Sequence, residues 1–346
     1  MKRGKRGVVT RIRGKSGDYE RPAGVQEGSV VSVFRVPPEV AGQRLDVFLT
    51  SQFRRTSRTR AQHIIRASAY DASGRMLKPN DRVHAEQEIL LWRAPWDETP
   101  VPTDIPVLYE DEHLIAIDKP ALLPVHPTAR YFNNTVIRIM QSERPGQFLS
   151  LGHRLDRETS GVMLVTKNPL CDRNLKKQLE ARDGVEKTYE ALTWGKPEWQ
   201  GQRFRYEQSV ELDDESPYGV KMRFGKTENA LYASTVFEVL GSKTSTGRTY
   251  SRVRCDLETG RQHQIRIHLA FGFQTPIVGD KLYGPDDSLF AKFADGELTD
   301  DHLELLELPR HALHAARIAL PHPVTGAPLA IEAPFPEDLK AFWESL

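Results

Sequence analysis

The sequence predicts an α+β fold in which a central mixed, largely antiparallel sheet is flanked by helices and loops, with a small α/β domain before it. Segments with strand and helix periodicity follow one another without regular alternation, and several strand-like segments adjoin directly. The 346 residues exceed what a single core usually needs, and a proline-rich stretch separates a short first part from a long second part. We therefore expect a basic, disordered arm (1–30), a small domain (31–93), a linker (94–106) and a large domain (107–346).

The arm and the small domain differ in their hydrophobic pattern. Residues 1–30 lack periodicity and are rich in Gly, Lys and Arg, which is the reason for expecting disorder there. The small domain shows two helical patterns, a turn and a closing strand. Its signals are, in order, Leu45, Phe48 and Leu49 at helical spacing, a helix that begins near Ser57 with Ala61, Ile64 and Ile65 on one face, the turn 71–74 and the strand Glu88–Trp92.

The large domain combines buried strands with capped helices. GVMLVTK, which begins at Gly161, is continuously apolar, and this is typical of a central strand. Neither an internal repeat nor a glycine-rich phosphate loop occurs. The other signals are the strand HLIAID ended by AspLysPro, a helix near Thr135 with Val136, Ile139 and Met140 on one face, a helix capped by Asn168 and Pro169 with Cys171, Leu175 and Leu179 as its stripe, and the strand KTYEALTW.

Charge is distributed unevenly along the chain, although the net charge is only +1. The first 16 residues carry seven Lys or Arg and no acid, whereas acid is concentrated in Asp286–Glu307. Clustered basic side chains are typical of nucleic-acid binding, but a solvated helix face and a solubilising tail also explain a charge run. Charge alone does not decide between them. A second basic stretch without acid consists of Arg54, Arg55, Arg58, Arg60 and Arg66.

Several classes of protein are disfavoured by composition. No run of about 18 apolar residues occurs, and the basic N-terminus lacks the apolar stretch of a secretory signal, so we expect a cytoplasmic protein. Cys171 and Cys255 are too few for a disulfide framework or a four-cysteine zinc site. No Cys pair accompanies the histidines and their spacings match no usual zinc site, so no metal is expected; they are His263, His268, His311, His314 and His322.

The segment HRLDRETSG (153–161) crowds polar groups between two apolar segments. In an extended loop, Arg154 and Asp156 would point the same way and place a cation beside a carboxylate. Asp156 would lie at the edge of the sheet, against an apolar wall formed by Val162 and Leu164, where its neighbours set its basicity. The alternative is a simple loop salt bridge, in which Arg154 or Arg157 pairs with Asp156 or Glu158.

Motifs across the large domain identify a family. In order, they are DEHLIAIDKPALLPVHP (111–127), GHRLDRETSGVMLVTK (152–167), KTYEAL (187–192), TGRQHQIRIHLA (259–270), GDKLYG (279–284) and HALHAARIALPHPVTG (311–326). This domain resembles the pseudouridine synthases of the RluA type. The small domain, with GQRLDVFL and SRTRAQHIIR, resembles the alpha-L RNA-binding motif, although AspAlaSerGly stands where that motif has a short turn around AsnGly.

The resemblance implies isomerisation of uridine in RNA without a cofactor. An aspartate attacks the nucleoside, the glycosidic bond breaks, and the base turns and rejoins the sugar through carbon. The reaction needs an ionised carboxylate and a place for a base removed from its stack. Asp156 is the expected nucleophile, and attack on the sugar C1′ and attack on the base C6 both remain open.

The resemblance assigns two further catalytic residues. Arg266 is the expected partner that keeps Asp156 charged, since an adjacent guanidinium lowers a carboxylate pKa by about 1 to 3 units. If 264–268 is a strand, Gln264, Arg266 and His268 share one face, as they would on a solvated edge. Tyr189 is expected to stack on the target base, the alternative being a half-buried strand tyrosine.

RNA contacts are expected from Arg154, which fills the gap left by the departed base or holds a phosphate, and from Arg58 and Arg60 in the small domain. The acidic segment 284–309 is expected to be a surface excursion, which repels wrong RNAs or is simply a solvated helix. The expected partner is ribosomal or transfer RNA, with no membrane and no metal, and we expect a monomer.

Two other functions fit the same residues. A non-catalytic RNA-binding or ribosome-assembly factor would keep the fold without turnover. A nucleoside hydrolase or glycosylase would use the same carboxylate and release free uracil. The presence of Asp156, Tyr189 and Arg266 together disfavours the first of these, and chromatography of the reaction would separate the second from an isomerase.

Overall fold

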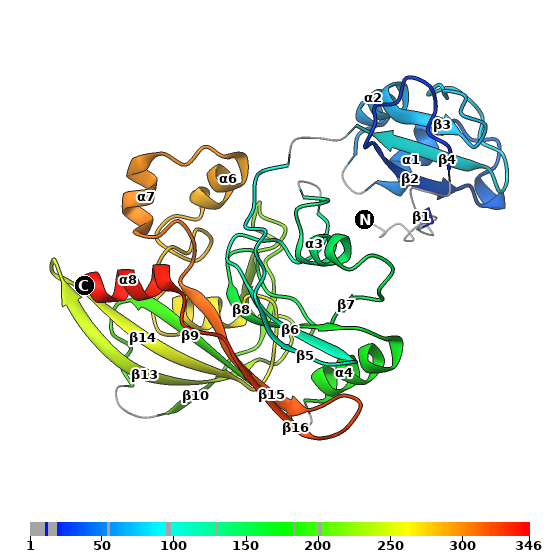
Figure 1. Ribbon diagram of the computed structural model, residues 1–346. Coiled ribbons are helices and arrows are strands. Elements are labelled where there is room, and N and C mark those ends of the chain that lie inside the picture. The colour runs from blue at the N-terminus through cyan, green and yellow to red at the C-terminus, as the bar shows by residue number, and fades with distance from the viewer. Residues whose placement is uncertain are drawn as a thin grey trace. The chain divides into compact units, whose positions relative to one another are not determined.

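The computed structural model describes residues 11–12, 19–53, 56–94, 98–128, 131–182, 184–199 and 203–346. The chain forms two compact units, Met1–Asp97 and Glu98–Leu346 (Figure 1). The division between them falls inside the proline-rich stretch 94–106. None of the helices in the described part of the chain has the length and apolar character that spanning a bilayer requires.

The first unit is a small antiparallel sheet with helices. Its strands, in spatial order, are β1 (Arg11–Ile12), β2 (Val30–Arg35), β4 (Glu88–Arg93) and β3 (Ala69–Asp71). The two predicted helices are present as α1 (Leu45–Gln52) and α2 (Arg58–Ser68), with a short 3-10 turn, η1 (Pro38–Val40), before them. Ser57 caps α2 by accepting the N–H of Arg60. Both helices bury apolar side chains against one face of the sheet.

Most of the basic arm predicted for 1–30 lies outside the described residues. Within the described part, Val25 is buried and packs with Val31, Val33 and Trp92 on the other face of the sheet. The Tyr19 hydroxyl donates to Glu88 at 3.0 Å. The segment from Tyr19 onward therefore belongs to the folded unit, because its apolar side chains cover a sheet face that the helices leave open.

The second unit is built on a ten-stranded sheet, which confirms the predicted mixed, largely antiparallel architecture. All its pairs are antiparallel except β8 with β15. Two strands lie off the main path, with β7 against β8 and β16 against β15. The path is β10 (Phe204–Glu207), β13 (Ser234–Ser245), β14 (Arg248–Leu257), β9 (Glu186–Trp194), β15 (Leu313–Pro321), β8 (Ser160–Thr166), β6 (Leu114–Lys119) and β5 (Val107–Glu110), with β7 (Ser150–Leu151) and β16 (Pro328–Glu332) beside it.

Helices cover both faces of this sheet (Figure 1). Met163 and Val165 of β8 belong to the main core, to which α3 (Val136–Glu143) and α8 (Glu337–Ser345) contribute. Val162 and Leu164 point to the opposite face and pack under α4 (Pro169–Ala181). The predicted continuous apolar strand is thus confirmed as a strand buried on both faces, since successive side chains of β8 enter different cores.

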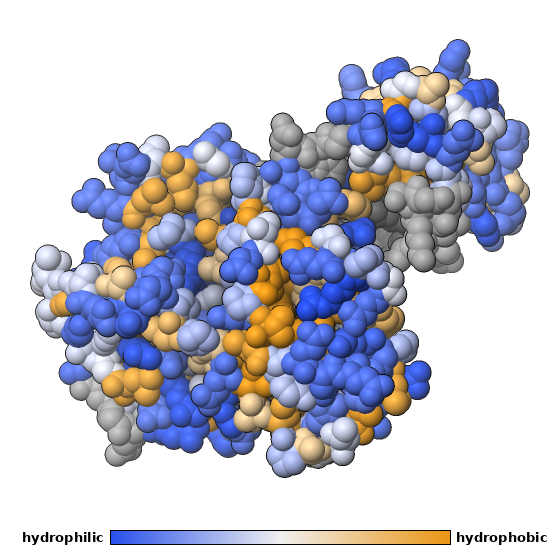
Figure 2. All heavy atoms as spheres, in the orientation of Figure 1, coloured by the Kyte–Doolittle hydropathy of each residue, from blue (hydrophilic) through white to orange (hydrophobic). Residues whose placement is uncertain are grey.

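The rest of the second unit consists of a small hairpin and short helices. β11 (Val210–Leu212) and β12 (Met222–Phe224) form a separate hairpin. A short helix, α5 (Gln264–Ile267), continues into a π-helical turn, η2 (His268–Gly272). The acidic segment holds α6 (Ser288–Asp295) and α7 (Asp300–Leu306). Apolar atoms appear among hydrophilic ones over α7 (Figure 2), the helix whose Leu303 and Leu305 are exposed.

Candidate active site

The loop that carries Asp156 ends where β8 meets β15. The N–H of Thr159 donates to the carbonyl of Asp156 at 3.2 Å, which closes a turn into the strand. Gly161 has φ +109°, and a Cβ there would stand 2.2 Å from the carbonyl oxygen of Ala315. Only glycine lets the two strands approach this closely. The turn holds the Asp156 side chain at the surface of a cavity, with 30% of it exposed.

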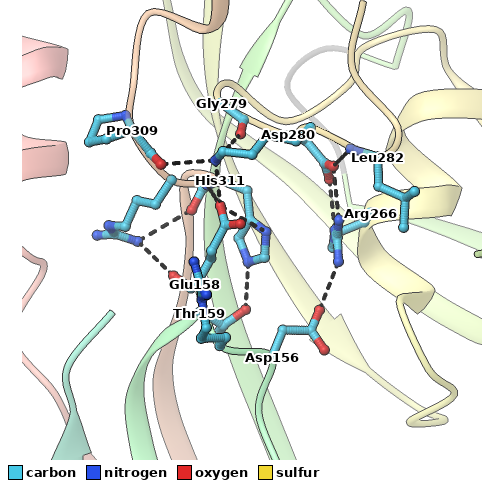
Figure 3. A network of polar contacts seen from close by, with 12 residues as sticks. Asp156, Glu158, Thr159, Arg266, Gly279, Asp280, Leu282, Pro309 and His311 are labelled. Atoms are coloured by element: carbon cyan, nitrogen blue, oxygen red, sulfur yellow. Dashed lines mark hydrogen bonds and ion pairs between the residues drawn. The ribbon is translucent and has the colours of Figure 1, made fainter. Parts of the chain in front are cut away.

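Arg266 contacts Asp156 and is itself fixed by a buried carboxylate (Figure 3). Its Nη1 donates to Asp156 Oδ2 at 3.0 Å. Its Nε and Nη2 donate to the two oxygens of Asp280 at 2.7 and 2.9 Å. Asp280 is fully buried and also accepts the N–H groups of Leu282 and Tyr283. Because Asp280 orients the guanidinium, one N–H of Arg266 is directed at Asp156 and cannot easily turn away.

The surroundings keep Asp156 ionised. Burial raises its pKa, but in the acidic range, where His263 and His311 are also charged, these two histidines and Arg266 outweigh burial and lower that pKa to about 2. Burial also lowers the pKa of His263 and of His311 to about 4, so both are neutral at neutral pH and Arg266 is the cation that acts there. Within the described residues, Oδ1 of Asp156 accepts no hydrogen bond. One carboxylate oxygen is therefore available to a substrate.

Tyr189 and Asp156 line one cavity of about 290 Å³, together with Arg154, Ile265 and Leu313. Tyr189 lies on β9 with only 9% of its surface exposed. Burial, and then the negative charge of Asp156, raise the pKa of its phenol, so the hydroxyl stays protonated. The cavity offers a ring face and apolar side chains next to an anionic oxygen. These are the features that a flat, uncharged base requires.

A second ion-pair network holds the loop from behind (Figure 3). Glu158 Oε2 accepts Lys281 Nζ at 2.8 Å and the N–H of His311 at 2.8 Å. The Thr159 hydroxyl bonds His311 Nε2 at 2.8 Å. Lys281 is nearly fully buried and also donates to the carbonyl of Pro309. The loop is thus tied to the segment that precedes β15, which lies about 150 residues further along the chain.

The simple loop salt bridge considered from the sequence is not what forms. Asp156 pairs with Arg266 and Glu158 pairs with Lys281. Arg157 turns away from both carboxylates, donates to the Tyr131 hydroxyl at 2.7 Å and stacks over the Phe293 ring at 4.3 Å. Phe293 lies on α6, so the acidic segment is in part a support of this loop and not only a solvated helix. Sequence alone could not show this, because no periodicity links a loop to a ring on a distant helix.

Two expectations about local structure were wrong. Gln264, Arg266 and His268 do not share a strand face, because 264–272 is helical and all three are buried. The Gln264 amide accepts from the Thr259 hydroxyl and the N–H of Arg261 and donates to the carbonyl of Ser234.

The predicted apolar wall of Val162 and Leu164 is also absent from this site. Both side chains face α4, since the alternation of β8 directs them to the opposite side of the sheet from the main core. The apolar residues that line the cavity with Asp156 are Leu155, Leu257, Ile265 and Leu313.

His263 was not identified from the sequence as a member of this site. It begins α5 in a left-handed conformation (φ 55°), and its Nε2 lies 3.7 Å from Asp156 Oδ2. Its Nδ1 lies 2.8 Å from the Tyr283 hydroxyl, which accepts the N–H of Met222 at 2.8 Å. That hydroxyl accepts from Met222 and can donate its own hydrogen to Nδ1; in this arrangement the proton of the neutral imidazole resides on Nε2, facing Asp156.

A buried lysine also supports the loop. Lys119 has no exposed surface and donates to the carbonyls of Pro120, Leu123 and Arg157 at 2.6, 3.0 and 3.2 Å. Burial, more than any neighbouring charge, lowers its pKa to about 7. The AspLysPro sequence indicated the end of a strand, but not that the lysine would hold the residue after Asp156.

The other predicted residues lie in different surroundings. Arg154 is exposed, lines the Asp156 cavity and forms no ion pair within the described residues. Arg58 and Arg60 belong to the first unit, where Arg58 pairs with buried Asp46 at 3.2 Å and Arg60 is exposed. Arg54 and Arg55 lie outside the described residues. Among the described residues, no group of His, Cys, Asp or Glu is arranged to hold a metal ion.

The chain is similar to known proteins over most of its length. The family model for RNA pseudouridylate synthase matches residues 113–271. Ribosomal large subunit pseudouridine synthase D of Xanthomonas campestris is 33% identical, over 90% of this chain and 91% of that protein. The protein of the same name from Pseudomonas aeruginosa is 32% identical, over 88% and 92%. A solved human structure, RNA Pseudouridylate Synthase Domain Containing 1, shares the fold with a TM-score of 0.54 at 21% identity, covering 68% of this chain and 86% of that one.

Proposed function

The chain belongs to the RluA-type family of RNA pseudouridine synthases, and on that premise we propose that it isomerises specific uridines of ribosomal RNA, with Asp156 as the nucleophile. Relatives that are 32–33% identical over about nine tenths of the chain are named for the large ribosomal subunit, which favours that RNA. The observation that carries the proposal is an ionised carboxylate with one free oxygen, in a cavity that it shares with Tyr189 and Arg266.

The groups of the cavity have separate tasks. Arg266 keeps Asp156 charged, and Asp280 keeps Arg266 in place. The target uridine leaves its stack and presents its base to Tyr189 while Oδ1 of Asp156 meets the nucleoside. The glycosidic bond breaks, and the enclosed base turns and rejoins the sugar through carbon. The cavity retains the base during this step, whereas a glycosylase would release it.

RNA binding is divided between the units. Arg154, exposed at the cavity and without an ion pair among the described residues, takes the place of the departed base or holds a phosphate. Arg58 and Arg60 of the first unit bind RNA phosphates away from the cavity. Such contacts fix the position of the RNA without reading its sequence.

Asp156→Asn tests the nucleophile, because it keeps the shape of the side chain and removes its charge. Large-subunit ribosomal RNA made without modifications is incubated with each protein, and pseudouridine is measured by mass spectrometry. We expect no product from Asp156→Asn and RNA affinity within about twofold of wild type. Asp214→Asn removes an exposed carboxylate from the same unit and should behave as wild type.

Three outcomes would contradict the proposal. Pseudouridine formation by Asp156→Asn would remove the central assignment. Free uracil in the wild-type reaction would indicate a glycosylase. RNA binding by wild type without turnover on any ribosomal RNA would favour an assembly factor.

A further inference from the structure

Four basic side chains near the Asp156 cavity have no carboxylate partner. Arg154 and Arg261 are exposed and line the cavity, and Arg182 and Lys187 are half-buried nearby. Within the described parts of the chain, none of the four forms an ion pair. Among the described residues, the one hydrogen bond that these four side chains donate runs from Arg261 Nε to the carbonyl of Tyr232, at 3.0 Å. Three more deeply buried cations of this unit, Arg266, Lys281 and Arg310, each bind a carboxylate, whereas buried Lys119 donates to backbone carbonyls.

Backbone geometry places Arg182 and Lys187 beside residues that line the cavity. Arg182 ends α4 in a left-handed conformation (φ 60°), and its Nη2 lies 2.9 Å from the place where a Cβ on Gly260 would stand. Gly260 lines the cavity and precedes Arg261, whose positive charge acts on Arg182. Lys187 lies two residues before Tyr189 on β9 and therefore leaves the same face of the sheet as Tyr189.

Burial and mutual repulsion both disfavour the charged forms of these side chains. Burial, followed by the charge of Arg261, lowers the pKa of Arg182. Burial, followed by the charge of Arg182, lowers the pKa of Lys187 to about 8. Half-buried cations that repel one another are an unfavourable arrangement until an anion lies between them. Phosphate suits it, since a guanidinium binds phosphate oxygens with two parallel N–H groups and lysine adds a point charge.

We propose that Arg182, Lys187 and Arg261, together with Arg154, form a subsite for the RNA phosphates that flank the uridine bound at Asp156. The proposal rests on the proposed function for the identity of the anion. Phosphate contacts here position the nucleotide while Tyr189 and Asp156 engage its base and sugar. The subsite binds RNA of any base sequence equally well, because phosphate groups are the same at every nucleotide.

Neutralising variants test the subsite. Arg182→Gln/Arg261→Gln is compared with Arg173→Gln/Lys177→Gln, which removes the same charge from exposed positions of α4 that form no ion pair with the described residues. The probes are a single-stranded oligonucleotide with a central uridine and unmodified large-subunit ribosomal RNA. We expect the salt dependence of oligonucleotide binding to fall by about 0.7 in slope for each lost contact, hence about 1.4 for the double variant. KM for ribosomal RNA should rise by at least about tenfold, with a smaller effect on kcat. The control pair should keep the wild-type slope and KM.

A second measurement does not depend on the variants folding. The pKa of Lys187, followed by NMR of its side chain in wild-type protein, should rise when the oligonucleotide binds and should rise less when neutral methylphosphonates replace the phosphates beside the uridine. Unchanged Lys187 titration, or a salt slope of the double variant equal to that of the control, overturns the subsite. Failure of the proposed function would give a different result. The wild-type reaction would then form no pseudouridine, while the two double variants would still differ in the salt dependence of oligonucleotide binding.

Discussion

At the scale of single residues, the site depends on how one guanidinium is shared between two carboxylates. Arg266 gives two N–H donors to Asp280, which has no exposed surface, and one to Asp156, which is 30% exposed. The buried carboxylate acts as an anchor and the exposed one retains a free oxygen. A carboxylate that bound both donors of the guanidinium fork would be a weaker nucleophile, because both its oxygens would be engaged.

The pH dependence of the reaction should report this arrangement. The folded-state pKa of Asp156 lies at about 2, below its usual 3.8, so its contribution to stability is full above that usual value and is lost as pH falls through about 2. The wild-type rate should therefore not fall on the acid side because of Asp156 until the protein itself is near unfolding. In Arg266→Gln/Asp280→Asn, which removes the charge pair together, Asp156 loses the charge and the hydrogen bond of Arg266, which both oppose the effect of burial, and its pKa rises. The single-turnover rate of this variant should then begin to fall at a higher pH than that of the wild type as the solution is acidified. If the rate falls at the same pH in both proteins, Arg266 does not act by keeping Asp156 ionised.

His263 is expected to position Asp156 through its neutral Nε2–H. Tyr283→Phe removes the hydroxyl that sets the imidazole tautomer and leaves the buried N–H of Met222 without its partner, which costs about 1–3 kcal/mol. We expect kcat to fall about tenfold with KM little changed, together with a lower melting temperature. Tyr218→Phe is the matched control, because that tyrosine packs in the same apolar cluster but its hydroxyl makes no hydrogen bond within the described residues. Equal effects of the two substitutions on kcat would reduce Tyr283 to a packing role.

At the scale of elements, the loop before β8 is held by segments from both sides of it in the sequence. Lys119, at the end of β6, binds the carbonyl of Arg157, and the segment before β15 binds Glu158 and Thr159. α6 contributes the ring of Phe293, and the cationic groups of Arg157 and Lys281 lie 4.3 and 4.4 Å from the centre of that ring. A loop that carries a nucleophile must be rigid, because small displacements of a reacting group reduce the rate steeply.

Phe293→Leu tests the contribution of α6 to the loop. The substitution keeps an apolar side chain and removes two cation–π contacts worth about 0.5–1 kcal/mol each. We expect pseudouridine formation to slow by roughly fivefold to thirtyfold, which corresponds to about 1–2 kcal/mol, with unchanged RNA affinity. Phe290→Leu is the control, since Phe290 is also half-buried on α6 but packs against Tyr218 and not against the loop. A weakening of RNA binding without a slower reaction would instead assign α6 to the RNA interface.

At the scale of the whole molecule, each unit contains basic side chains that are paired with carboxylates and basic side chains that are exposed. The second unit pairs buried Arg266 and Lys281 with carboxylates and leaves Arg154 and Arg261 exposed at the cavity. In the first unit, Asp46 has no exposed surface and accepts from Arg44, Arg58 and Gln62, and these contacts hold its pKa well below the usual range. Arg58 is thus partly structural, whereas Arg60, exposed on the same helix, makes no such contact among the described residues.

This difference separates the two arginines in an RNA-binding experiment. Arg60→Gln should reduce the salt dependence of RNA binding by about 0.7 to 0.9 in slope without changing the melting temperature. Arg58→Gln should reduce the slope similarly and also lower the melting temperature, because Asp46 loses a partner. Arg75→Gln, which removes an exposed charge from a turn of the same unit, serves as control. If Arg60→Gln and Arg58→Gln both keep the wild-type salt dependence of RNA binding, these two arginines do not contact RNA phosphates.

Much of the fold could be predicted because it follows from local rules. The helices that begin after Ser57, Thr135 and Asn168 start where side-chain caps occur, and β8 was recognisable from its unbroken apolar run. The helix at Gln264–Ile267 was mistaken for a strand, because alternating polar and apolar residues also arise in a buried helix whose polar side chains all have partners. Packing decided that element, since periodicity over so few residues does not distinguish the two.

The sequence by itself determined the family, the mixed sheet and the candidacy of Asp156, because periodicity, capping and motif order are properties of neighbouring residues. Only the tertiary structure decided which basic side chain forms an ion pair with which carboxylate. Asp156 and Arg266 are 110 residues apart, and Glu158 and Lys281 are 123 apart. The strength of an ion pair depends on distance and burial, and these are defined only when the sheet has brought distant segments together. The same holds for His263, Phe293 and the four unpaired cations, whose chemistry is a consequence of their position.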